Sequence, residues 1–313
     1  MPPALPTRFK RPRLLIVGCG DVGLRVARRL RGRFRLLALT SSPHRVAALR
    51  EAGVVPLVGD LGQAETLLRL GSLAPRVLHL APPPAAGDTD GHTAHLVAAL
   101  ARAAVVRRLV YGSTTGVYGD AAGAWLGETA ALRPATARAR RRVDAEQRLR
   151  AYGRACGVAV SLLRIPGIYA LDRAGGDPRE RVREGTPVLL PADDVYTNHI
   201  HAEDLARACI AALHRGRPQR VVHVCDDTEL RMGDYFDLVA DLAGLPRPPR
   251  LTREEASRQL SPTRLSFMSE SRRLHNRRLK QELKLRLHYP TVAEGLSAGD
   301  DEHPPPPAGT LAC

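Results

Sequence analysis

The sequence predicts an α/β protein with a doubly wound parallel sheet and a smaller C-terminal domain. In its first half, short runs rich in leucine and β-branched residues alternate with amphipathic segments of about ten to fifteen residues, which is the pattern of successive βαβ units. A glycine-rich turn follows the first run and precedes a helical segment. The length of 313 residues, with 44% hydrophobic side chains, allows one large domain or two ordinary ones.

The elements of the N-terminal half follow in a regular order. The first strand is the apolar run at residues 14–18, and the helix after it has helical spacing at Val22, Val26 and Leu30. The fourth strand ends at Ala81, where three prolines begin. The expected strands are residues 14–18, 34–40, 54–58, 77–80, 108–112 and 158–163, and the expected helices are residues 21–30, 43–52, 92–104 and 137–153.

The alternation loosens after Pro166. A polar segment, an extended stretch, a helix and a returning strand are expected at residues 172–184, 188–200, 203–213 and 221–225. We expect a first domain at residues 13–165, to which residues 197–226 return, and a smaller substrate domain at residues 166–196 and 227–298, over the carboxyl edge of the sheet. Residues 1–12 are expected to be a flexible arm and residues 299–313 a disordered tail, because both are rich in proline.

Composition narrows the class of protein. No apolar run approaches the roughly 20 residues that cross a bilayer, and the first residues lack the apolar stretch of a secretory signal. Five widely spaced cysteines without a CxxC pair argue against a disulfide framework or a zinc module. We expect a cytoplasmic protein without a membrane partner.

The charge balance is strongly basic, with 47 Lys and Arg residues against 32 Asp and Glu residues and a formal net charge of +15. Only three of the basic residues are lysines, the arginines are dispersed, and aromatic residues make up 4% of the chain. This pattern indicates a GC-rich coding bias more than selection for polyanions. Nucleic acid is therefore not the expected partner, and the basic stretch at residues 271–286 keeps a polyanion as an alternative.

The glycine-rich turn is a G-x-G-x-x-G motif that runs from Gly18 to Gly23. Here Gly18 would allow the tight turn, Gly20 would leave room for a pyrophosphate, and Gly23 would allow helix and strand to pack closely. The N–H groups at the start of the helix, near Asp21 and Val22, would then face the phosphates. The motif predicts dinucleotide binding of the Rossmann type, with a structural turn as the alternative.

The end of the second strand indicates which dinucleotide is bound. NAD-binding chains carry an acidic residue there, which accepts a hydrogen bond from the ribose 2′-hydroxyl. This sequence has Ser41 and Arg45 instead, and no carboxylate before Glu51. A hydroxyl and a guanidinium suit a 2′-phosphate, so we expect NADP in preference to NAD. The alternative is that Arg45 is a solvated helix residue.

Residues after the third and fourth strands complete the expected cofactor contacts. Asp60 follows the third strand, where it would either contact the adenine amino group or cap a helix. Leu61 and Ala81 are the further expected contacts.

Six short segments lie in order within residues 17–227. They are VGCGDVG, VGDL, YGSTTGVYGD, LLRIPGIY, NHIHAEDLARA and VVHVCDD. With them the sequence resembles the extended short-chain dehydrogenase/reductases, the group that includes NAD-dependent epimerases and dehydratases acting on nucleotide sugars. A closing segment at residues 269–296 extends the resemblance over most of residues 13–296. The family usually spaces its loop G-x-x-G-x-x-G, and the first of those positions is Val17 here. The resemblance implies hydride transfer without a metal, and a homodimer is common among its members.

The catalytic residues of this family are a Ser or Thr and a Tyr-x-x-x-Lys pair. The resemblance places the first at Thr114, but it places the Tyr and the Lys at Arg138 and Arg142. Arginine does not act as a general acid or base. Each arginine either belongs to a solvated helix face, with Arg142, Glu146 and Arg150 paired at i,i+4, or points into the cleft and orients ribose, phosphate or an anionic substrate.

The proton donor is left open by this substitution. Tyr118 is one candidate, with packing as its alternative, and water is another. His199 and His201 share one face of an expected strand, a spacing that indicates a strand end before a helix near Glu203 more than a metal site.

These inferences predict an NAD(P)-binding oxidoreductase or epimerase-like enzyme that acts on a small molecule such as a nucleotide sugar. Thr114, Tyr118 and Arg142 are its candidate catalytic residues. The alternative is a non-catalytic nucleotide-binding sensor or assembly factor, because the acid–base pair of the family is missing.

Overall fold

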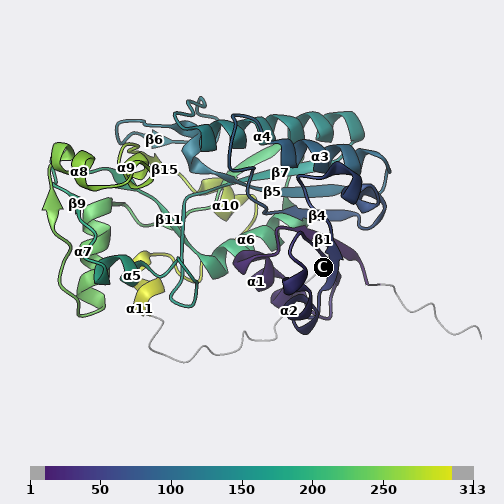
Figure 1. The fold of residues 1–313 in the computed structure, drawn as a ribbon, viewed down its shortest axis with the longest axis horizontal. Helices are drawn as coiled ribbons and strands as arrows, with labels where there is room; N and C mark the ends of the chain where they lie inside the picture. The colour runs from purple at the N-terminus through teal and green to yellow at the C-terminus, as the bar shows by residue number, and fades with distance from the viewer. Residues whose placement is uncertain (1–10, 298–313) are drawn as a thin grey trace, which may run out of the picture.

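A computed structural model describes residues 11–297 of the chain. Its centre is a seven-stranded parallel sheet with the order β12-β7-β5-β4-β1-β2-β3 (Figure 1). The predicted α/β class and doubly wound sheet are confirmed. The expected arm and tail lie outside the described residues, apart from residues 11 and 12.

The strands of the sheet lie within three residues of the expected positions at either end. They are β1 (Arg13–Val17), β2 (Arg35–Thr40), β3 (Val55–Val58), β4 (Arg76–His79), β5 (Arg108–Thr114), β7 (Ala159–Ile165) and β12 (Arg220–His223). The returning strand pairs with β7, with Val221 opposite Leu162. The region expected to return therefore adds the seventh strand.

The chain reverses its direction of winding between β1 and β4. From β1 it proceeds outward to β2 and β3, and then crosses back to β4 on the other side of β1. No α-helix covers this crossover, which carries two 3-10 turns at Ala64–Leu67 and Leu70–Ser72. The loops after β1 and β4 diverge at this point, which is where open α/β sheets bind their ligands.

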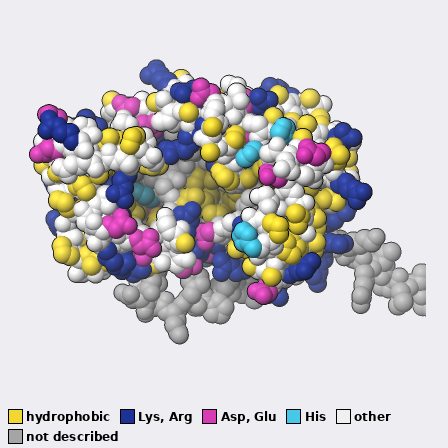
Figure 2. All heavy atoms as spheres, in the orientation of Figure 1, with side chains coloured by type: hydrophobic (Ala, Val, Ile, Leu, Met, Phe, Trp, Pro, Cys, Tyr) yellow, Lys and Arg dark blue, Asp and Glu magenta, His cyan; other side chains and the backbone are white. Residues whose placement is uncertain are grey.

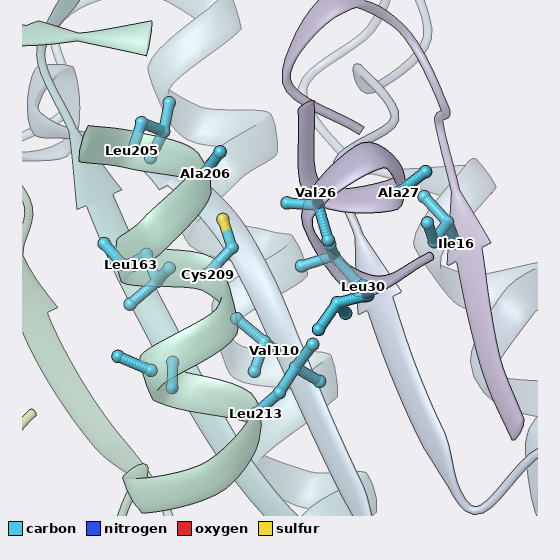
Figure 3. Packing of buried hydrophobic residues seen from close by; sticks show 14 of the residues in the cluster. Ile16, Val26, Ala27, Leu30, Val110, Leu163, Leu205, Ala206, Cys209 and Leu213 are labelled. Carbon is cyan, nitrogen blue, oxygen red and sulfur yellow. The ribbon is translucent and has the colours of Figure 1, made fainter. Parts of the chain in front are cut away.

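Helices cover both faces of the sheet, as Figure 1 shows. One face carries α3 (Gly91–Ala101) and α4 (Ala137–Cys156), and the other carries α1 (Asp21–Leu30), α2 (Val46–Glu51) and α6 (Ala202–Arg215). Alternate residues of β1 enter the two cores, Leu14 and Ile16 on the α1 side and Leu15 and Val17 on the α4 side. In Figure 3, Leu30 of α1 lies beside Leu213 of α6.

The helix α4 holds the two arginines of special interest. Its first turn is capped by Thr136, whose hydroxyl accepts a hydrogen bond from the N–H of Ala139, and Gly157 ends it in the left-handed conformation. Leu149 and Tyr152 are buried against the sheet. Arg138 and Arg142 therefore lie in its first two turns, near the carboxyl ends of the strands.

The C-terminal part has an apolar cluster of its own, which includes Tyr169, Val182, Phe236 and Val239. Its helices are α5 (Pro178–Arg183), α7 (Met232–Leu242), α8 (Arg253–Gln259), α9 (Pro262–Phe267), α10 (Arg277–Gln281) and α11 (Val292–Ser297). Short two-stranded pairs join β8 (Gly167–Tyr169) to β11 (His199–His201), β9 (Val188–Leu189) to β14 (Arg250–Leu251), β10 (Tyr196–Thr197) to β13 (Leu230–Arg231), and β6 (Trp125–Leu126) to β15 (Arg273–Leu274). The division into two domains at the expected boundaries stays a prediction.

No helix in the described part of the chain is long and apolar enough to span a membrane.

Candidate cofactor and substrate site

The glycine loop between β1 and α1 brings two backbone segments into close approach. Gly18 has a φ of +86°, and a Cβ built on it would lie 2.3 Å from the backbone nitrogen of Ala81. A Cβ on Gly23 would lie 3.2 Å from the carbonyl oxygen of Gly18, whereas a Cβ on Gly20 would meet no atom within 4 Å. The loop is therefore tight at Gly18 and Gly23 and leaves open space in front of Gly20.

A first cavity, which we name the β2 cavity, lies at the ends of β1 to β4. It brings together Gly18, Gly20, Ser41, Arg45, Asp60, Leu61 and Ala81, which are predicted cofactor residues from four separate segments. The Nη2 of Arg45 donates a hydrogen bond to the carbonyl oxygen of Cys19 at 2.8 Å. This contact directs Arg45 toward the glycine loop, and its contact with a cofactor stays a prediction.

Asp60 turns the chain at the floor of the β2 cavity. Its Oδ1 accepts a hydrogen bond from the N–H of Gly62 at 2.8 Å. The 3-10 turn that follows begins at Ala64 and has Gln63 in its cap position, so the helix-capping alternative is wrong. The contact of Asp60 with adenine stays a prediction.

A second cavity, the α1 cavity, opens at the start of α1. It is lined by Gly18, Gly20, Asp21, Val22, Gly23, Leu80, Gly112, Ser113, Thr114, Arg142, Ile165, Pro166, Ile168, Arg173 and Leu205. The Asp21 carboxylate accepts a hydrogen bond from Nε of Arg25 at 3.0 Å and lies 3.2 Å from Nε of Arg173. Because these two cations hold the Asp21 side chain, this residue offers a ligand its backbone N–H.

Arg142 faces the α1 cavity. Its Nη1 donates hydrogen bonds to the hydroxyl of Tyr111 and the carbonyl oxygen of Gly112, both at 2.9 Å. Glu146 does not pair with it. Glu146 is buried and accepts hydrogen bonds from Arg164 and Ser113. The interpretation of Arg142 and Glu146 as partners on a solvated helix face is therefore wrong.

Tyr118 belongs to a buried polar network beneath the site. Arg164 forms an ion pair with Glu146 at 2.7 Å and donates a hydrogen bond to the Tyr118 hydroxyl, also at 2.7 Å. The same hydroxyl is bonded to Nε2 of His223. Burial raises the pKa of Tyr118. Arg164 and His223 hold the Tyr118 hydroxyl inside this network, an arrangement that favours the packing alternative. The role of Tyr118 as proton donor stays a prediction.

A third cavity, the Thr114 cavity, adjoins the second. It has a volume of about 260 Å³ and shares Thr114 and Pro166 with the α1 cavity. The Oγ1 of Thr114 accepts a hydrogen bond from the N–H of Gly116 at 3.2 Å, at the start of the 3-10 turn Thr115–Tyr118. Figure 2 shows the face of the molecule hollowed between the sheet and the C-terminal part.

The Thr114 cavity is lined mainly by residues that the sequence did not indicate. Arg138, one of whose two expected places is the cleft, lines this cavity. The others that matter most are Arg181, His199, Tyr235 and Phe236. They come from α5, β11 and α7, which meet only in the folded chain. The sequence marks His199 through its spacing from His201, and no motif or spacing marks the other three.

His199 begins and His201 ends the strand β11, and the two rings make different contacts. The ring of His199 stacks on Tyr235 at 3.9 Å between centroids, whereas Nδ1 of His201 accepts a hydrogen bond from the N–H of Glu203 in the first turn of α6. Burial lowers the pKa of His199 to about 3 and that of His201 to about 4. The predicted strand end before a helix is confirmed.

A known protein family matches most of the chain. The model of the NAD dependent epimerase/dehydratase family matches residues 14–225. The comparison with curated proteins gives no match.

Three solved structures illustrate the likeness. A functionally unknown conserved protein from Silicibacter pomeroyi DSS is 33% identical with a TM-score of 0.79, over 93% of this chain and 100% of that one. The UDP-glucose 4-epimerase of Thermotoga maritima, solved with UDP-glucose, is 18% identical with a TM-score of 0.74, over 91% and 96% of the two chains. The dTDP-glucose 4,6-dehydratase of Bacillus anthracis, solved with NAD, is 16% identical with a TM-score of 0.73, over 91% and 94%. The last two show likeness of fold.

Proposed function

This chain belongs to the NAD-dependent epimerase/dehydratase family, and on that premise we propose that it binds a nicotinamide dinucleotide and exchanges hydride with a carbonyl or hydroxyl carbon of a small molecule. The observation that carries the proposal is the open space in front of Gly20. This residue lines both the β2 cavity and the α1 cavity. A dinucleotide spans two such cavities across a helix N-terminus.

Separate groups of residues would contact the three parts of the cofactor. The adenosine half would occupy the β2 cavity beside Asp60 and Leu61, the pyrophosphate would lie on the N–H groups of Asp21 and Val22, and the nicotinamide half would reach toward Thr114. The bound cofactor supplies or accepts the hydride. Arg142, which already donates to the hydroxyl of Tyr111, would donate to a ribose hydroxyl.

NADP is the dinucleotide that we propose. Ser41 and Arg45 line the β2 cavity at the end of β2, where a 2′-phosphate would lie. Arg45 bonds a neutral carbonyl, and no carboxylate of the described part of the chain pairs with it, so its charge is available to a phosphate. The Bacillus anthracis dehydratase was solved with NAD, which makes the preference for NADP a point on which this chain would differ.

Thr114 is the proposed catalytic residue. Its hydroxyl would donate a hydrogen bond to the reacting oxygen, and water would exchange the proton, because neither Arg138 nor Arg142 releases one. Positioned acid–base groups contribute roughly 10² to 10⁴ in rate, so turnover should be slow. Nucleotide sugars are one substrate candidate, since the Thermotoga maritima epimerase was solved with UDP-glucose.

Two measurements test this proposal. Titration of the purified chain with NADPH and NADH, followed by nicotinamide fluorescence, should show binding of both and tighter binding of NADPH. The absence of any response to either would overturn the proposal. Thr114→Ala should lower turnover about 10- to 100-fold while leaving the affinity for NADPH within about twofold.

A non-catalytic nucleotide-binding protein is the second candidate, and the arginines at positions 138 and 142 favour it. The variant with Arg138→Tyr and Arg142→Lys separates the two. Turnover gained only in this variant would support the binding protein, whereas turnover in the unaltered chain would support the enzyme.

A further inference from the structure

The Thr114 cavity carries an excess of positive charge. Three arginines and one glutamate line it, namely Arg138, Arg181, Arg272 and Glu270. Arg272 forms an ion pair with Glu270 at 2.8 Å and also donates to the carbonyl oxygen of Gly119. The charges of Arg272 and Glu270 therefore cancel, and Arg138 and Arg181 remain.

Arg181 is held in the cavity wall without an anion. Its Nε and Nη2 are buried and have no hydrogen-bond acceptor among the described residues. The guanidinium lies 4.2 Å from the centre of the Phe236 ring. Burial, together with the charge of Arg264, lowers the pKa of Arg181 to about 10. Burying a guanidinium without a partner costs free energy, so this arrangement is unfavourable until an anion arrives.

Arg138 enters the same cavity from α4. Its guanidinium lies 4.5 Å from the centre of the Phe267 ring, and no carboxylate pairs with it in the described part of the chain. Both arginines therefore rest on aromatic faces, which orient the cations without neutralising them. The family resemblance also places the catalytic tyrosine at Arg138.

The remaining walls of the cavity are aromatic and apolar. Tyr196, Tyr235, Phe236 and Phe267 line it, together with the ring of His199. The Nδ1 of His199 is buried and has no hydrogen-bond partner within residues 11–297. These walls suit a planar or apolar body carrying a charged end and a few polar groups.

The volume of the cavity restricts the size of this body. At about 260 Å³ it lies below the range of about 300 to 1,000 Å³ typical of pockets for drug-sized ligands. This volume favours a compact ligand, and a nucleotide sugar would extend beyond this cavity.

We propose that the Thr114 cavity takes a compact anionic substrate, a small carboxylate or phosphate ester, whose anion lies between Arg138 and Arg181. The reacting carbon then lies beside Thr114, at the boundary with the α1 cavity. This inference rests on the proposed function for the reaction, but the anion site itself can be tested without the cofactor.

The test is calorimetric titration of the full chain, without dinucleotide, with malonate, inorganic phosphate and UDP-glucose as separate probes. At least one small anion should bind, and Arg181→Met and Arg138→Met should each weaken it at least tenfold. Arg183→Met is the matched control, because Arg183 lies on the same helix α5 with an exposed side chain, and it should change affinity less than twofold. Malonate and phosphate distinguish a carboxylate site from a phosphate site.

Thermal unfolding gives a second readout that a structural role of Arg181 would not produce. Arg181→Met keeps the apolar stem against Phe236 and removes the unpaired charge, so the variant should melt at or above the temperature of the unaltered chain. It should also lose the rise in melting temperature that the bound anion causes. A clear fall in its melting temperature without ligand would overturn the inference.

Three binding results would also overturn it. They are no binding of either small anion at about 10 mM, equal affinity of Arg181→Met and the unaltered chain, and UDP-glucose binding more tightly than both small anions. NADPH titration of the same preparations keeps the two proposals apart. A chain that binds the anion but no dinucleotide would sink the proposed function alone, and one that binds NADPH but no anion would sink this inference alone.

Discussion

Two regions of the site meet at Thr114. The β2 and α1 cavities lie on one side and the Thr114 cavity lies on the other, and the two sides are formed by different parts of the chain. Backbone shapes the first side, through the glycine loop, and the charged side chains there already have partners, as Arg45 has in the carbonyl of Cys19. Side chains shape the second, and its cations, Arg138 and Arg181, rest on aromatic rings without an anion. A backbone cradle serves any ligand with a diphosphate, whereas unpaired cations require a particular anion. Specificity for the substrate therefore resides on the Thr114 side.

The largest expected effect comes from filling the backbone cradle at its tightest point. Gly18→Ala places a Cβ 2.3 Å from the nitrogen of Ala81 at a φ of +86°, so the loops after β1 and β4 must separate. We expect the free energy of unfolding to fall by about 3 kcal/mol, measured by urea denaturation.

Gly20→Ala is the matched control for that variant, because a Cβ there meets no atom within 4 Å. Its stability should change by less than about 0.5 kcal/mol, while its affinity for NADPH should fall at least tenfold, since the Cβ takes the space of the pyrophosphate. Equal stability losses at the two glycines would break the comparison, because the cradle would then have no open side.

The same contrast explains how far sequence reasoning reached. The glycine loop is formed by six consecutive residues, so the sequence alone predicts its chemistry. Ser41, Arg45 and Asp60 could be predicted because each lies just after the end of a predicted strand. Arg181 has no such signature. Its surroundings arise from helices far apart in sequence.

Pairings across the fold were equally hidden. The spacing of Glu146 from Arg142 suggested a surface pair. Glu146 turns inward instead, because the buried Arg164 of β7 offers it two hydrogen bonds. Tyr118 is drawn into the same network. A one-dimensional pattern shows which residues share a helix face, but not which partner the neighbouring strand presents to it.

The next effect concerns acid sensitivity on the Thr114 side. Burial lowers the pKa of His199 from 6.5 to about 3, so between these values the unfolded chain binds a proton that the folded chain does not. The free energy of unfolding therefore falls as the pH falls from 6.5 toward 3. His199→Phe preserves the stacking on Tyr235 and removes this protonation.

In that variant the slope of unfolding free energy against pH should become shallower, by up to about 1.4 kcal/mol per pH unit, in urea denaturation at pH 4, 5 and 6. Asp226 contributes a slope of unfolding free energy against pH with the opposite sign, and Asp226→Asn tests it. Burial raises the pKa of Asp226 to about 8, so stability is lost as the pH rises from 4 to 8, and the variant should flatten that limb. If His199→Phe leaves the slope unchanged, the His199 ring has a hydrogen-bond partner in solution. The Thr114 side would then hold one unpaired polar group fewer.

The smallest expected effect tests whether any selectivity resides on the backbone-built side. Arg45→Ala removes the guanidinium that lies over Cys19 and should weaken NADPH binding about tenfold while changing NADH binding less than twofold, because NADPH alone carries the 2′-phosphate. Arg50→Ala, an exposed position on α2, the helix that begins directly after Arg45, should leave both affinities unchanged. If Arg45→Ala weakens the binding of NADH as much as that of NADPH, Arg45 supports the glycine loop and does not contact the 2′-phosphate. All selectivity for ligands would then belong to the Thr114 side.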